Sequence, residues 1–325
     1  MRVRTPLVAA WLAVFGCTHG PSAAPAEATS APSVTASSGP SPADITLPAS
    51  SSTTAPSGGA LVVVLSPTRL ALDRDGAALA VPPADHATWP LGFEAQFKRQ
   101  SRNDFFVKAL GDAMEARFAA DAAVPNVVLM VDAAIAYRLF SETIYTLGQE
   151  RASQIALAVN SGARVGSIAL TLPRRDDPEI MMEREAARRA VLAALAMDGG
   201  ARPSAPGAMP SPNASSVPDD HLFLNVVIES AGFVVSGRGR RMSPGCREAG
   251  NGVAVPTRDG AYDFAGLTAC AATLKGSAPA YATETKVTLS AAASTDIQTV
   301  VSAIDALRGG AEPLFPLVSL GVPRG

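Results

Sequence analysis

Histidine, cysteine and aromatic residues are scarce in this chain of 325 residues, which has three histidines, three cysteines and 5% aromatic residues. The histidines at positions 19, 86 and 221 show neither a metal-ligand spacing nor an HExxH pattern. His86 stands beside Asp85, but such a pair in a loop is more typical of solvated side chains than of metal ligands. We therefore expect neither a metal nor a cofactor.

The short motifs that define common catalytic and nucleotide-binding sites are also missing. We find no GxSxG nucleophile motif, no GxGxxG after a strand and no P-loop. A basic stripe with interleaved aromatic residues is absent as well, so nucleic acid is not an expected partner. These absences favour a non-enzymatic protein. An uncharacterised enzyme remains the third alternative, because catalytic groups can converge from distant positions.

The N-terminal apolar stretch, residues 6–16, has 11 residues and is shorter than the roughly 20 that a membrane-spanning helix needs. Arg2 and Arg4 precede it, so residues 1–16 are predicted to be an export signal peptide. Residues 14–17 (Val-Phe-Gly-Cys) resemble the lipobox of bacterial lipoproteins, which implies that Cys17 is lipidated and anchors the protein to a membrane. The alternative is an ordinary signal peptide in which Cys17 is incidental.

Composition divides the remaining chain into tethers and domains. Residues 17–59 are almost entirely Ala, Ser, Pro, Thr and Gly, and such a segment cannot bury enough apolar surface to fold. We predict a disordered tether there. A second linker rich in Pro, Ser and Gly, residues 199–219, would separate a first domain (60–198) from a second (220–325). An exported, tethered protein of this kind is expected at the periplasmic side of the cell envelope, lipid-anchored, with the outer membrane favoured over the inner.

One pattern occurs twice. Residues 126–159 read as strand, amphipathic helix and strand, and the pattern returns 160 positions later without a gap, so that Ile144 falls on Ile304. Upstream of each copy lies a β-hairpin pattern, residues 61–76 and 224–239. Two matching pairs in the same order indicate a tandem duplication of a domain of about a hundred residues.

The order of these patterns predicts the fold class. We expect an α+β protein with two tandem β-β-α-β-α-β domains, each a mixed sheet with two helices packed on one face. The first helix of each domain is expected near residues 103–119 and 262–274. An additional strand is expected at 165–172, and an amphipathic helix at 180–197.

Asp132, directly after a predicted strand, is the first candidate site residue. Its carboxylate is expected to cap the helix beginning near residues 133–136 by accepting hydrogen bonds from the first amides. A lone catalytic carboxylate is the alternative. The second copy has Ala292 at this position but supplies residues 294–296 (Ser-Thr-Asp) shortly afterwards, so its helix is expected to be capped slightly later.

The other candidate residues lie in the second domain. Arg238, Arg240 and Arg241 crowd one hairpin turn, which is either a solvated turn or a contact for an anion or for peptidoglycan. Cys246 and Cys270 lie 24 positions apart in an exported domain, a pattern that suggests a disulfide. Two buried free thiols are the alternative.

A family resemblance follows from the first copy. A hairpin, a helix, a strand ending in Val131 and Asp132, Tyr137 five residues later, an amphipathic helix and a closing strand resemble the periplasmic domain of ExbD and TolR. Those proteins are stator-type subunits of proton-driven energisers of outer-membrane transport. The resemblance covers residues 60–172 and, more loosely, 220–322, where alanine and isoleucine replace Asp132 and Tyr137.

The resemblance implies a role as a non-enzymatic interaction or accessory component of a Ton/Tol-type biopolymer transport system, with motor or other envelope proteins as partners. ExbD and TolR carry a transmembrane helix with an acidic residue, whereas the first 26 residues here contain no Asp or Glu. A channel function of this chain is therefore not implied. The alternative function is a cell-wall (peptidoglycan) binding module that uses an exposed sheet edge or the turn at Arg238.

Overall fold

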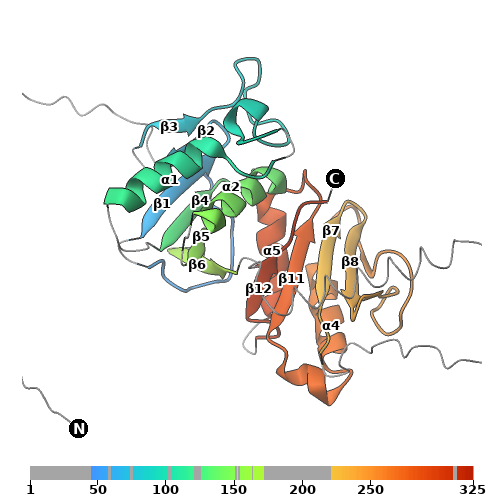
Figure 1. The fold of residues 1–325 in the computed structure, drawn as a ribbon. Coiled ribbons are helices and arrows are strands. Elements are labelled where there is room, and N and C mark those ends of the chain that lie inside the picture. Colours follow the sequence, from blue (N-terminus) through green and yellow to red (C-terminus); the bar gives the residue numbers. More distant parts are fainter. Residues whose placement is uncertain are drawn as a thin grey trace, which may run out of the picture. The chain divides into compact units, whose positions relative to one another are not determined.

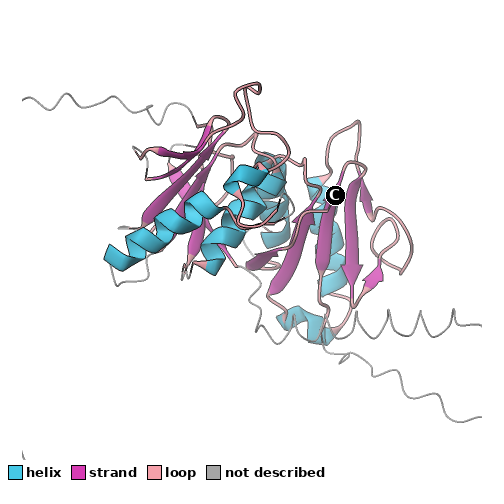
Figure 2. Ribbon diagram, turned by 45° about the horizontal axis from the view of Figure 1, so that its top comes forward, coloured by secondary structure: helices cyan, strands magenta, loops and turns pink. Residues whose placement is uncertain are grey.

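The computed structural model describes residues 45–171, apart from short gaps at 58–59, 74–75, 102–103, 121–125, 151, 153 and 163, together with residues 221–309 and 313–324. The described residues form two copies of one α+β arrangement (Figure 1). In each copy two helices cover one face of a mixed sheet (Figure 2), which confirms the predicted fold class. The predicted signal peptide, Cys17, the helix at 180–197 and the linker at 199–219 lie outside the described residues.

The first copy has a six-stranded sheet in the order β3-β2-β1-β4-β5-β6. Strands β1, β4 and β5 are parallel, whereas β2, β3 and β6 pair antiparallel with their neighbours. Its elements are, in chain order, β1 (Leu61–Ser66), β2 (Arg69–Leu72), β3 (Ala78–Ala80), η2 (Ala95–Phe97), α1 (Lys108–Ala120), β4 (Val127–Val131), α2 (Tyr137–Gln149), β5 (Ile155–Asn160) and β6 (Val165–Leu170).

The second copy repeats the parallel centre, β7-β11-β12, and the hairpin beside it. Here β10 and β9 both pair with β8. Its elements are β7 (Asn225–Glu229), β8 (Gly232–Gly237), β9 (Arg240–Arg241), β10 (Val255–Pro256), α4 (Phe264–Lys275), η3 (Pro279–Thr283), β11 (Lys286–Ala291), α5 (Ile297–Arg308) and β12 (Leu317–Leu320). The 160-residue repeat is therefore confirmed, because β4-α2-β5 and β11-α5-β12 match in order and pairing.

Burial explains why the repeated segment is so apolar. All five residues of β4 are buried, because the helices cover one face of the sheet and a small second cluster covers the other. A strand buried on both faces is expected to read as a continuous hydrophobic run rather than an alternating one. Helix α2 places Leu139, Phe140, Ile144 and Leu147 in the core, as its spacing predicts.

The first helix of the first copy begins later than the sequence predicts. Asp104 lies instead in a loop that is closed by an isolated antiparallel bridge between Lys98 and Val107, where Arg99 N–H donates to the carbonyl of Phe106 (3.3 Å). The carboxylate of Asp104 accepts from the amide of Phe106 (3.0 Å), which closes a turn before the helix starts at Lys108. In the second copy the first helix, α4, lies within two residues of its predicted bounds.

Among the helices in the described ranges, none combines the length and the apolar character needed to cross a bilayer.

Candidate functional site: the seam between the two copies and its strap

The two copies meet through the loops that lead into their second helices, residues 133–138 and 293–298, which together we call the seam. Tyr137 N–H donates to the carbonyl of Thr295 (2.7 Å), and 160 positions on, Ile297 N–H donates to the carbonyl of Ile135 (3.0 Å). A second reciprocal pair runs from Arg138 to Ala293 and from Gln298 to Ala133, each at 3.0 Å. Each copy thus makes the same contact to the other, as in an isologous dimer interface.

These hydrogen bonds cap both helices. The first amides of an α-helix have no partner within the helix and need acceptors from outside. In α2 the residue before the helix is Ala136, with no side-chain cap, and the carbonyls of the second copy supply the acceptors. Helix α5 has an additional cap, because the carboxylate of Asp296 accepts from Thr299 N–H (2.7 Å). The predicted later cap of the second helix is confirmed.

Tyr137 extends the contact across the seam. Its side chain is fully buried, and its hydroxyl donates to the carbonyl of Gly321 (2.7 Å) in the second copy. Burial raises the pKa of the Tyr137 phenol well above its usual range, so the group stays protonated and remains a donor. Ile297, the equivalent residue, is also buried but has no hydroxyl to donate across the seam.

A segment preceding the first domain crosses this seam. We call residues 45–54 the strap. Thr46 N–H donates to the carboxylate of Asp132 (2.8 Å), and Ala133 N–H donates back to the carbonyl of Thr46 (2.7 Å). Ile45 and Leu47 pack against a small apolar cluster on the face of the sheet away from the helices, formed by Val64, Ala71, Val128, Met130 and Ala158. The prediction of a disordered tether through residue 59 is therefore wrong for the strap.

The role predicted for Asp132 is also wrong. One oxygen of its carboxylate accepts from Thr46 N–H and the other from Ala134 N–H (3.0 Å), so the side chain holds the strap and closes a turn. Helix α2 begins at Tyr137, too far along the chain for Asp132 to cap it. In the second copy Ala292 needs no carboxylate, because the chain there pairs with Arg324 through main-chain hydrogen bonds (2.9 Å each).

The strap then contacts helix α5 of the second copy. The amide side chain of Gln298 makes two hydrogen bonds to the backbone of Ala49, accepting from its N–H (2.7 Å) and donating to its carbonyl (3.1 Å). The carboxylate of Asp305 accepts from the hydroxyl of Ser50 (3.0 Å) and from Ser51 N–H (2.8 Å). The second copy therefore holds the strap through side chains of α5, which bond mainly to the backbone of the strap.

On its other side the strap pairs with the first sheet. Ser50 N–H donates to the carbonyl of Asn160 at the end of β5 (2.9 Å), and Asn160 N–H donates to the carbonyl of Pro48 (2.8 Å). Further on, Ser167 in β6 donates its N–H to the carbonyl of Thr54 (2.7 Å). One short segment thus bonds to β5, β6 and α5, and so to both copies.

A buried ion pair lies deeper in the first copy. Lys98 Nζ and Glu142 Oε1 are 2.5 Å apart, and their side chains are 0% and 1% exposed. Arg138 Nε lies 2.5 Å from the same oxygen, while the other oxygen of Glu142 accepts from Phe93 N–H (3.0 Å). Lys98 also donates to the carbonyl of Asp104 (2.7 Å). Burial lowers the pKa of Lys98, and the hydrogen bond and negative charge of Glu142 act against that shift.

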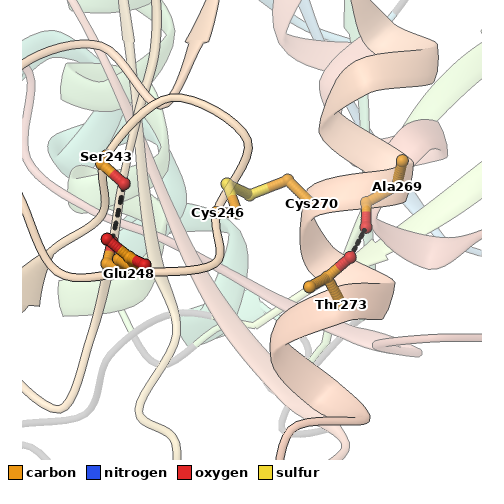
Figure 3. Close-up of a disulfide and its surroundings, with 6 residues drawn as sticks. All are labelled: Ser243, Cys246, Glu248, Ala269, Cys270 and Thr273. Atoms are coloured by element: carbon orange, nitrogen blue, oxygen red, sulfur yellow. Dashed lines mark hydrogen bonds between the residues drawn. A yellow bond between two sulfur atoms is a disulfide. The ribbon is translucent and has the colours of Figure 1, made fainter.

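In the second copy, Cys246 and Cys270 form a disulfide (Figure 3) with their Cα atoms 5.3 Å apart. The predicted bridge is confirmed, and the alternative of two free thiols is wrong. The bond joins the loop after β9 to helix α4, and both cysteines are buried. It therefore stabilises a long connection that has little regular structure of its own.

The three arginines lie at the turn between β8 and β9. Arg238 (φ 53°) and Gly239 (φ 72°) are both left-handed, as a two-residue type I′ hairpin turn requires. The guanidinium of Arg238 donates to the hydroxyl of Tyr281 (3.3 Å), whereas Arg240 and Arg241 are exposed to solvent. Two of the three arginines are therefore exposed at this turn, and a contact with an anion or with peptidoglycan stays a prediction.

His86 and Asp85 lie in an exposed loop, where His86 Nε2 and Asp85 Oδ2 are 3.9 Å apart. Across the described ranges no cluster of three or more His, Cys, Asp or Glu side chains is arranged to hold a metal ion.

Two features of this site escaped the sequence analysis, although each left a signal. Glu142 is an acidic residue three positions after Leu139 on the apolar face of its helix, a place where a charged side chain requires a buried partner. Ile45 and Leu47 are the only isoleucine and leucine between Thr18 and Gly59. Two alternate apolar residues in such a stretch indicate a short segment that packs.

Comparisons with protein-family models, with curated proteins and with solved structures find no match for this chain.

Proposed function

We propose that the chain is a lipid-anchored envelope protein that acts as a non-enzymatic interaction or accessory component of an ExbD/TolR-like transport system. The observation that carries this proposal is the seam. Two copies of an α+β domain join through reciprocal hydrogen bonds, and the end of the N-terminal tether bonds to both. Such an arrangement suits a body that is held at a membrane and presents a fixed pair of domains to a partner.

The family part of the proposal is supported by the order of elements in each copy. A hairpin, a helix, a strand, a second helix and a closing parallel strand follow one another in both. Fold alone does not define function, since one fold supports many activities. The additional support is Tyr137, which the resemblance singles out and which lies at the contact between the copies.

Membrane attachment depends on Cys17. We expect Cys17→Ala to release the protein from the membrane fraction and to abolish labelling with a radioactive or clickable fatty acid, because the thiol is the site of acylation. Cys246 and Cys270 are bonded to each other, so they offer no alternative thiol. Labelling that persists in Cys17→Ala would contradict lipidation at this residue.

The partner is tested by affinity purification of the tagged full chain from solubilised envelopes. The proposal predicts that inner-membrane motor proteins of the Ton/Tol type are recovered with it. A tagged Cys17→Ala protein serves as a control, because it tests whether recovery requires membrane attachment. Recovery of no motor protein from the anchored chain would argue against the transport role.

The second candidate, a cell-wall binding module, is favoured by the exposed pair Arg240 and Arg241 beside the turn at Arg238. This alternative predicts that the purified chain sediments with isolated peptidoglycan. Replacing Arg240 and Arg241 with alanine should then abolish sedimentation without altering the fold, since both side chains are exposed. Sedimentation that does not depend on these arginines would remove the support that the turn offers.

A further inference from the structure

The strap differs from the strands beside it in how it is held. Every residue of β4 is buried, whereas of the strap residues only Pro48 and Ser52 are buried. The strap is therefore retained chiefly by hydrogen bonds that lie near solvent, where the net contribution of each is small. Segments with few buried apolar contacts and exposed backbone hydrogen bonds are the first to open in a native protein.

The hydrogen bonds of the strap nevertheless form a continuous series. Five of its amides donate: Thr46 to Asp132, Ala49 to Gln298, Ser50 to Asn160, Ser51 to Asp305 and Ser52 to the hydroxyl of Ser50. The first four acceptors alternate between the first copy and the second, and the fifth, the hydroxyl of Ser50, belongs to the strap itself. Because the chain enters the strap at Ile45, a pull on the tether loads the bond at Thr46 first and the others after it.

We propose that the strap is a tension-sensitive clasp that detaches when the tether is pulled, while both copies stay folded. Detachment removes the bonds that Gln298 and Asp305 make to Ala49, Ser50 and Ser51, and it leaves the direct contacts of the seam in place. It also uncovers the apolar cluster of the outer sheet face that Ile45 and Leu47 contact. The clasp thereby converts tension at the membrane into an altered surface on the first copy.

Use of the clasp in the cell rests on the membrane attachment proposed above, but detachment itself does not. The test is a single-molecule pulling experiment on the full chain, with one handle on the Cys17 thiol and one at the C-terminus. Cys17 is the one cysteine of three that is not in the disulfide, so the handle attaches there. A failure of lipidation would overturn the anchoring and leave this experiment unaffected.

We expect the first rupture to be short and reversible. Freeing the chain between residue 45 and β1 releases about 16 residues, which extends it by at most about 58 Å. Unfolding a whole copy of about a hundred residues would instead extend it by several hundred ångströms. A first rupture of that larger size, with no short step before it, would overturn the proposal.

Two variants locate the step. Asp305→Ala removes the acceptor for Ser50 and Ser51, and Asp132→Ala removes the acceptor for Thr46, so each is expected to lower the force of the short step. Asp112→Ala is the matched control, because Asp112 is an exposed helical aspartate whose ion pair is with Lys108 on the same helix. A short step that is unchanged in both strap variants would arise elsewhere and would overturn the assignment.

Hydrogen exchange on the unpulled chain supplies an independent measurement. The five donating amides of the strap should exchange as one group, at least tenfold faster than those of β4 and β5. Asp305→Ala should accelerate that group further and leave β4 unchanged. If the strap amides of the native chain exchange as slowly as those of β4, the strap is an integral part of the fold and the proposal fails.

Discussion

Replacing Glu142 with alanine is expected to destabilise the first copy by about 3–5 kcal/mol, the cost of leaving a buried charge without its partner. Among the described residues, Lys98, whose side chain is 0% exposed, would keep only the carbonyl of Asp104 as an acceptor, and Phe93 N–H would lose its acceptor. The free energy of unfolding, measured by chemical denaturation, tests this prediction. Glu142→Ala with the stability of the native chain would contradict the structural importance of the pair.

Two further variants separate charge from packing. In Glu142→Gln the negative charge that raises the pKa of Lys98 is lost, so burial lowers that pKa further and the amine is more easily deprotonated. Because the folded pKa of Lys98 lies below its unfolded value, the stability of this variant should rise with pH between the two values. Replacing Lys98 by methionine and Glu142 by leucine together should cost little, since apolar pairs of similar volume often replace buried ion pairs without loss.

Removing the disulfide is expected to cost the second copy about 3.5 kcal/mol, the chain-entropy value for a closed loop of this length. The double variant Cys246→Ser/Cys270→Ser should therefore unfold at lower denaturant concentration than the native chain. Reduction of the native chain should reproduce the shift once denaturant exposes the bond, because both cysteines are buried. Cys17→Ser is the control and should leave the transition of the second copy unchanged. An equal transition midpoint with and without the bridge would show that the loop is held by its other contacts.

Glu142→Ala changes the first copy, and the cysteine double variant changes the second. Measured together, the two variants test whether the seam couples the unfolding of the two copies. If the reciprocal hydrogen bonds make the copies unfold together, either variant will shift a single transition. If the copies unfold separately, each variant will shift one of two transitions. Two-state analysis applies in the first case, and a separate stability for each copy in the second.

The repeat, the fold class and the disulfide could be predicted from the sequence because each depends on local or countable features. In the second helix of the second copy, α5, apolar residues recur at helical spacing, and these residues are buried in the structure. Cys246 and Cys270 could be paired because the second domain holds no other cysteine. The later cap at Asp296 follows from the residue type and from its place before Ile297.

Asp132 shows why the rest could not be predicted. A carboxylate before a helix is locally an ordinary cap, and the sequence contains no sign that carbonyls of Ala293 and Thr295 take that role. The carboxylate is then available to Thr46, which lies 86 positions away in the chain. The sequence by itself determined the elements and their duplication, because periodicity and turn residues act over a few positions. The tertiary structure alone decided the seam, the strap and the partner of Glu142, because those contacts depend on which distant segments the fold brings together.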